Sequence, residues 1–243
     1  MNNVGNIYGE VVSVHKTGCF VNIKGHQHFC LVKSAEKPVV NDKVILKQRE
    51  DKWFIMDITE RKSFVARYDF YKERYQGFAA NVDTAFIVTS ANKEFSENRI
   101  SRFLALLQGQ EIRKVIVLTK TDLAPSVIEY EKSLGCFEGV EQVLINAKNA
   151  SDVFKLLKFL KAGGTALLMG SSGVGKSTII NTLCGLELKT NDVQSERLGN
   201  KGKHTTSARI MYYLPDGRKI IDTPGIKIVG IEGECNSRQV TRR

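Results

Sequence analysis

Residues 170–177 read Gly170-Ser171-Ser172-Gly173-Val174-Gly175-Lys176-Ser177, a full match to the phosphate-loop pattern Gly-x4-Gly-Lys-Ser. The apolar run 165–169 before this loop predicts a buried strand, and the residues after it predict a helix. Glycines let backbone N–H groups close around phosphates, and the helix N-terminus adds its positive end. We expect Lys176 to reach the β- and γ-phosphates and Ser177 to bind Mg²⁺. Thr178 belongs to the same predicted phosphate site.

The other nucleotide-binding motifs stand in an unusual order. Thr119-Lys120-Thr121-Asp122, which fits a base-reading motif, comes before the phosphate loop, and Asp222-Thr223-Pro224-Gly225 comes after it. In Ras-like proteins the phosphate loop comes first and the base-reading motif follows Asp-x-x-Gly. The parts are therefore those of a GTPase, and the order is that of a circularly permuted one.

The base-reading motif selects guanine by its chemistry. Asp122 offers two acceptor oxygens to the paired N1–H and N2–H donors of guanine, a pair that adenine lacks, and Lys120 is able to lie along the base. Thr119 replaces the more usual asparagine, so a hydroxyl is kept and an amide is lost. Asn146 and Ala147, at the end of the next predicted strand, fit the motif whose backbone N–H contacts guanine O6.

The last motif and the segment before it predict the magnesium and switch groups. We expect Asp222 to hold Mg²⁺ through a water and the Gly225 N–H to meet the γ-phosphate. Residues 202–207 predict a switch, with Thr205 or Thr206 as a second magnesium ligand. Ile226 stands where Ras-type enzymes place the glutamine that orients water. His204 is the only histidine within these motifs, so it is a candidate for that task, with an ordinary surface residue as the alternative.

The hydrophobic pattern predicts two domains and an α/β fold class. Residues 1–62 contain five short alternating segments, which favour a five-stranded OB-like β-barrel that binds RNA. Residues 63–80 form a basic and aromatic connector, suited either to stacking on bases or to packing between domains. Strands and helices alternate over 81–230, which predicts a permuted P-loop GTPase domain with a parallel sheet, and 231–243 form a tail. A hairpin is predicted over 210–221. One helix is predicted around 100–107, and two others begin at residues 151 and 176. The predicted strands cover 9–14, 19–23, 28–32, 43–46, 53–58, 82–90, 114–120, 140–145 and 165–169.

Composition narrows the partners. The 243 residues carry a net charge of +10, which indicates a polyanion such as nucleic acid, or else a lysine-rich solvated surface. No apolar run is long enough for a membrane span, and the five scattered cysteines fit reduced thiols in the cytoplasm. His26, His28 and Cys30 share one face of a predicted strand, as metal ligands or as ordinary barrel side chains.

With these motifs in this order, the chain resembles the RsgA/YjeQ family of circularly permuted GTPases. The resemblance runs from about residue 8 to 230, and it includes the entry Ala80-Asn81-Val82-Asp83 and the segment Gly202-Lys203-His204-Thr205-Thr206. It implies a barrel that contacts ribosomal RNA, GTP hydrolysis with Mg²⁺ stimulated by the small ribosomal subunit during its late assembly, and a catalytic role for His204. We also expect a monomer in the cytoplasm.

One departure from the family pattern concerns the C-terminal region. Family members continue into a helical zinc module with three cysteines and a histidine, whereas Cys235 is the only such residue after Gly225 here. We therefore expect no zinc site in this chain. The chain is then a short form of the family, a fragment or a diverged paralogue. Two alternatives to a GTPase stay open: a non-catalytic, nucleotide-gated RNA-binding module, and an ATP-dependent kinase, which would leave Asp122 and Asp222 unexplained.

Overall fold

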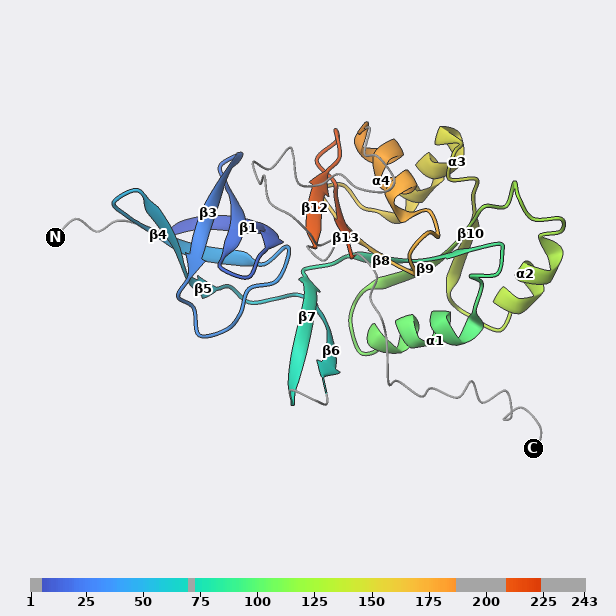
Figure 1. The fold of residues 1–243 in the computed structure, drawn as a ribbon, viewed down its shortest axis with the longest axis horizontal. Coiled ribbons are helices and arrows are strands. Elements are labelled where there is room, and N and C mark those ends of the chain that lie inside the picture. The colour runs from blue at the N-terminus through green and yellow to red at the C-terminus, as the bar shows by residue number, and fades with distance from the viewer. Residues whose placement is uncertain (1–5, 70–72, 187–208, 224–243) are drawn as a thin grey trace.

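The structure is a computed structural model that describes residues 6–69, 73–186 and 209–223. Its N-terminal part is a five-stranded barrel (Figure 1). Strand β1 pairs antiparallel with both β2 and β4, β2 pairs with β3, and β5 lies between β3 and β4. The predicted five strands are confirmed as β1 (Ile7–Val14), β2 (Cys19–Ile23), β3 (His26–Val32), β4 (Lys43–Arg49) and β5 (Lys52–Ile58).

Side chains at alternate positions of the strands point inward and fill the barrel. Val11, Val21 and Ile55 are fully buried in its core, beside Leu46. Cys30 is also fully buried, whereas the ring of His28 lies 5.4 Å from that of Trp53 on the barrel surface. Within the described ranges, no group of three or more histidine, cysteine or acidic side chains could hold a metal ion. In the structure the three residues are side chains of β3, with His26 exposed, His28 half-buried and Cys30 buried.

A separate two-stranded sheet follows the barrel. Strands β6 (Phe64–Asp69) and β7 (Arg74–Ala80) pair antiparallel and project away from the rest of the molecule (Figure 1). The rings of Tyr68 and Tyr75 contact each other edge to face, with centroids 5.3 Å apart. The stretch whose sequence indicated only a connector is therefore a hairpin with aromatic and basic side chains on its strands.

The C-terminal part is the α/β domain. Its parallel strands follow the order β10-β9-β8-β11-β13, and β12 joins antiparallel beside β13. The strand that carries the base-reading motif thus precedes the phosphate-loop strand in the chain, as the circular permutation predicts. The strands are β8 (Thr84–Ser90), β9 (Arg113–Thr119), β10 (Glu141–Leu144), β11 (Thr165–Met169), β12 (Ile210–Tyr213) and β13 (Lys219–Asp222).

Helices cover both faces of this sheet (Figure 1). One buried cluster includes side chains of α1 (Glu97–Leu106) and α2 (Ile128–Leu134), and another includes side chains of α3 (Ala150–Phe154) and α4 (Lys176–Cys184). The single helix expected from residue 151 begins at Ala150, where the Asn149 side chain caps it, and it tightens into the 3-10 turn η1 (Lys155–Phe159). No helix within the described ranges is both long and apolar enough to cross a bilayer.

The barrel and the α/β domain share one continuous sheet of 11 strands, because β1 also pairs with β12 at Ser13 and Ile210. Asn41 fastens the same junction from within: its Nδ2 lies 3.0 Å from the carbonyls of Ala80 and Asn81, and 3.3 Å from the Thr165 hydroxyl. Asn81 in turn donates to the Asn41 carbonyl. The start of the phosphate-loop strand is thereby tied to the barrel.

A charged cluster closes the outer side of the junction. Glu10 of β1 accepts hydrogen bonds from Lys219 and Tyr213, at 2.5 and 2.9 Å, and also pairs with Lys43. Glu10 is 9% exposed, and its cationic partners lower its pKa against the opposing effect of burial. The barrel is therefore attached by backbone pairing, buried amides and ion pairs together.

Candidate functional site

The phosphate loop connects β11 to α4 at the carboxyl end of the parallel sheet, where such sheets bind ligands. Glycine is required at Gly170, because φ is 154° and an added Cβ would lie 2.3 Å from the Val88 carbonyl oxygen. Gly175 caps the helix with φ of 102°. The sequence therefore folds locally as the motif demands, with a tight loop that runs into a helix N-terminus.

Lys176 begins helix α4, and its ammonium lies over the loop. Its Nζ donates to the carbonyl oxygens of Gly170 and Ser171 at 2.9 and 2.7 Å. The residue is 7% exposed, and burial lowers its pKa, which the nearby Asp222 carboxylate opposes. The cation predicted to contact phosphates is thus held inside the loop, whose Ser172 and Gly173 are exposed.

Asp222 ends strand β13 beside this ammonium. It is paired in register with Leu168 of β11, and burial raises its pKa against the effect of Lys176. Its Oδ1 is buried and has no hydrogen-bond partner among the described residues. A buried carboxylate oxygen normally has a partner, so this atom fits a cation ligand. Thr223 then anchors the strand end, since its hydroxyl donates to the Leu168 carbonyl at 2.5 Å.

The base-reading motif ends strand β9 and is tied to the phosphate loop through Thr119. This residue is fully buried, and its Oγ1 lies 2.6 Å from the Val174 carbonyl oxygen and 3.0 Å from that of Thr89. The chain then turns sharply at Lys120, where φ is 58°, and Asp122 follows on an exposed turn. Thr119 therefore faces the loop, while Asp122 is open to a ligand.

The supporting motif follows β10 and meets the same point. An added Cβ on Gly175 would lie 3.6 Å from both the Ala147 Cβ and the Thr119 Oγ1, so all three motifs converge. The Asn146 N–H donates to Asp152 at 2.9 Å, and the Lys148 N–H donates to the Asn146 side chain at 2.9 Å. Both N–H groups are used within the turn, whereas no described group accepts from the Ala147 N–H.

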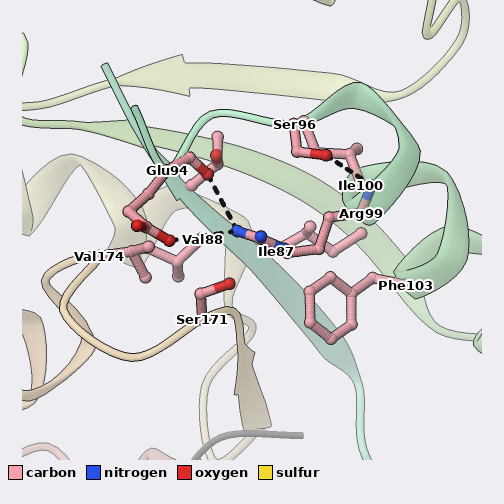
Figure 2. A pocket seen from close by; sticks show the side chains of 10 residues that line it. Ile87, Val88, Glu94, Ser96, Arg99, Ile100, Phe103, Ser171 and Val174 are labelled. Atoms are coloured by element: carbon pink, nitrogen blue, oxygen red, sulfur yellow. Dashed lines mark hydrogen bonds and ion pairs between the residues drawn. The ribbon is translucent and has the colours of Figure 1, made fainter. Parts of the chain in front are cut away.

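A small cavity lies behind the phosphate loop, against helix α1 (Figure 2). Ser171 and Val174 line one side of it, and Arg99 lines the other, with its guanidinium bonded to the Glu94 carbonyl at 3.0 Å. Its volume of about 10 Å³ is room for a single water molecule. The loop is therefore backed by packed side chains on this face, and Ser172 and Gly173 are exposed on it elsewhere.

Several predicted site residues lie outside the described residues. They are His204, Thr205, Thr206, Gly225 and Ile226. The structure does bring together the phosphate loop, Thr119, Asn146, Ala147 and Asp222. The sequence did not indicate that Thr223 and Asp152 anchor these motifs by side-chain hydrogen bonds. The signal for Asp152 was its place in the first turn of a helix, directly after the supporting motif.

Comparisons with known proteins agree with this geometry. The model of one family, RsgA GTPase, matches residues 58–232. The small ribosomal subunit biogenesis GTPase RsgA 2 of Vibrio parahaemolyticus is 35% identical over 224 residues, which cover 91% of this chain. A protein named small ribosomal subunit biogenesis GTPase RsgA, from Methanosarcina acetivorans, is 35% identical over 90% of the chain. This chain spans 62% of the length of each of these two relatives.

Two solved structures share the architecture. The crystal structure of YjeQ from Thermotoga maritima aligns with a TM-score of 0.65 at 25% identity. The alignment covers 91% of this chain and 75% of the YjeQ chain. The structure of YloQ, described as a circularly permuted GTPase, aligns with a TM-score of 0.62 over 95% of this chain and 75% of its own. At 19% identity, the second likeness concerns the fold alone.

Proposed function

Because the chain belongs to the RsgA GTPase family, we propose that it binds GTP with Mg²⁺ and hydrolyses it to GDP and phosphate during late assembly of the small ribosomal subunit. The observation that carries this proposal is the convergence of the phosphate loop, the base-reading turn and Ala147 around Gly175. This arrangement holds one nucleotide, with its base at one end and its phosphates at the other.

The exposed base-reading turn selects guanine. Asp122 accepts from N1–H and N2–H of the base, and Lys120 and Thr121 flank it. The Ala147 N–H donates to O6, because its neighbours Asn146 and Lys148 already spend their N–H groups within the turn. Thr119 does not contact the base. It positions the base-reading turn by a hydrogen bond from its hydroxyl to the Val174 carbonyl.

The phosphates lie against the loop and the start of α4. Backbone N–H groups of residues 170–178 surround them, and Lys176 exchanges its two carbonyl contacts for phosphate oxygens. Ser177 and Asp222 would hold Mg²⁺, which supplies positive charge to the phosphates when bound. The unpartnered Asp222 Oδ1 supports this assignment. From the motifs we add Thr205 or Thr206 as a further ligand and Gly225 at the γ-phosphate, and from the family resemblance His204 to orient the attacking water.

We propose ribosomal RNA of the small subunit as the partner, in the cytoplasm, with the chain acting as a monomer. The net charge of +10 and the projecting hairpin β6–β7, which carries Arg67, Arg74 and Tyr75, support a polyanionic partner. Tyr75 is 70% exposed and available for stacking on a base.

The test is steady-state GTP hydrolysis, with and without purified small ribosomal subunits. Stimulation by the subunits supports the GTPase, and Lys176→Ala should abolish it. Tight binding of GTP and of subunits without any turnover would instead favour the non-catalytic, nucleotide-gated module. Equal affinity for ATP and GTP would contradict the proposed base recognition.

A further inference from the structure

Arg209 lies where the barrel, the hairpin β6–β7 and the nucleotide site meet. Its Nη1 donates to the Gly77 carbonyl of β7 at 2.9 Å, and its guanidinium lies over the ring of Phe78, 4.5 Å from the centroid. Among the residues that the structure describes, Arg209 has no carboxylate partner. Among the described residues, the arginine is thus held by β7 through one hydrogen bond and one aromatic ring.

The next residue connects this contact to both domains. Ile210 begins β12, and its backbone is in register with Ser13 of the barrel on one side and with Asp222 on the other. Asp222 is the proposed magnesium ligand. The dipeptide Arg209-Ile210 therefore contacts the middle of β7, the barrel and the end of β13.

The Arg209 contact also has room to change. Gly77, Phe78 and Arg209 line an open cavity of about 80 Å³, whose other wall is Val14 and residues 38–40 of the barrel. Burial and the charge of Arg67, on the same ring, both lower the pKa of Arg209, so its charge is incompletely compensated. A cation held by a carbonyl and a ring beside a cavity is able to shift when the hairpin or the barrel is displaced.

We propose that Arg209 is the positioning residue that couples RNA bound at the hairpin and barrel to nucleotide bound at Asp222. This inference rests on the proposed function and adds its regulation. Displacement of β7 by RNA moves Arg209 and the start of β12, and the paired strand β13 carries the change to Asp222. Coupling of this kind is reciprocal, so nucleotide must alter RNA affinity by the same factor as RNA alters nucleotide affinity.

The experiment measures that factor. The affinity of a non-hydrolysable GTP analogue is determined with and without purified small ribosomal subunits, for the unmodified chain and for Arg209→Met and Arg209→Lys. Arg218→Lys is the matched control, because Arg218 also donates to a backbone carbonyl, that of Leu157 at 2.9 Å, but lies at the far end of the β12–β13 hairpin. We expect Arg209→Met to keep its nucleotide affinity without subunits and to lose about fivefold or more of the coupling factor.

Arg209→Lys should recover only part of the coupling, because a lysine donates to Gly77 but does not stack as a plane on Phe78. Arg218→Lys should keep all of it. The reverse measurement, subunit affinity with and without the analogue, must change by the same factor and so checks the measured coupling. An unchanged melting temperature of Arg209→Met excludes general destabilisation. Full coupling in Arg209→Met would overturn the inference while leaving the GTPase intact. If the unmodified chain binds subunits without coupling, the inference alone is overturned, whereas absence of subunit binding would overturn its ribosomal premise.

Discussion

At the scale of single residues, Asp122 is the residue proposed to select the base. Replacing it with asparagine exchanges one acceptor oxygen for a donor, so one guanine N–H loses its partner. We expect Asp122→Asn to weaken GTP binding by about 1–3 kcal/mol and to shift preference toward xanthosine triphosphate, whose base has an acceptor at that position. Competition binding with GTP, ATP and xanthosine triphosphate measures this, and an unchanged ranking of the three would contradict it.

Substitutions of Thr119 show whether a residue that does not contact the base affects the affinity for GTP. Its single hydroxyl proton is shared between the Val174 and Thr89 carbonyls. Thr119→Val keeps the shape but leaves buried carbonyls unpaired, so GTP affinity should fall by about 1–3 kcal/mol. Thr119→Ser, which keeps the hydroxyl, should restore most of that loss. Equal affinities for the valine and serine variants would remove the positioning role.

Asp222 gives the site a pH dependence of known sign. Burial raises its pKa, so its carboxyl keeps a proton at pH values where an exposed aspartate is already ionised. Because Mg²⁺ binds only the ionised form, we expect magnesium affinity to rise as pH increases through this raised pKa and to be lost below it. Magnesium titrations followed by the shift in melting temperature check this, and Asp222→Asn should flatten the dependence.

At the scale of elements, the hairpin β6–β7 is the proposed RNA-binding unit outside the barrel. Each phosphate contact releases counterions, so affinity falls with salt at a slope set by the number of contacts. Replacing Arg67, Lys72 and Arg74 with alanine should flatten that slope by up to about 3 while leaving GTP affinity unchanged. A salt titration of small-subunit binding measures the slope, and an unaltered slope would exclude the hairpin as a phosphate contact.

Local patterns were enough to predict most elements, and long-range pairings were not. Strand β11 matched its predicted range because a buried parallel strand is a continuous apolar run bounded by glycine. The hairpin β6–β7 was missed because its strands mix tyrosine and arginine with alanine and glycine, without a clear alternation, and the two strands pair only with each other in their sheet. Helix α2 was missed because it is short and has no side-chain cap.

The candidate site divides in the same way. The motif pattern was enough to predict the residues of the phosphate loop. The predicted ends of two parallel strands were enough to predict that Asp122 and Asp222 lie at the same edge of the sheet. The role of Thr119 could not be predicted, because its partner Val174 lies 55 residues away in sequence. Nothing in the sequence around Arg209 indicates that Gly77, 132 residues earlier, accepts its hydrogen bond.

At the scale of the whole molecule, Asn41 holds the barrel to the α/β domain. It is 1% exposed, has φ of 67°, and its amide serves carbonyls on the entry to β8. We expect Asn41→Ala to lower the free energy of unfolding by about 2–4 kcal/mol, from buried carbonyls without donors and a left-handed backbone that alanine disfavours. Asn41→Gly relieves the backbone and should cost about 1 kcal/mol less. Urea unfolding compares the two, and equal losses would place the whole effect in the amide.

The pairing of Ser13 with Ile210 also sets the order in which this chain is completed during synthesis. The barrel needs only residues up to Ile58, so it is able to fold as soon as that stretch has left the ribosome. The strand that pairs with the barrel, β12, is made after β8, β9, β10 and β11. Asn41 is able to reach Ala80, Asn81 and Thr165 before β12 is made, so the β1–β12 pairing completes a junction that the barrel has already begun to form.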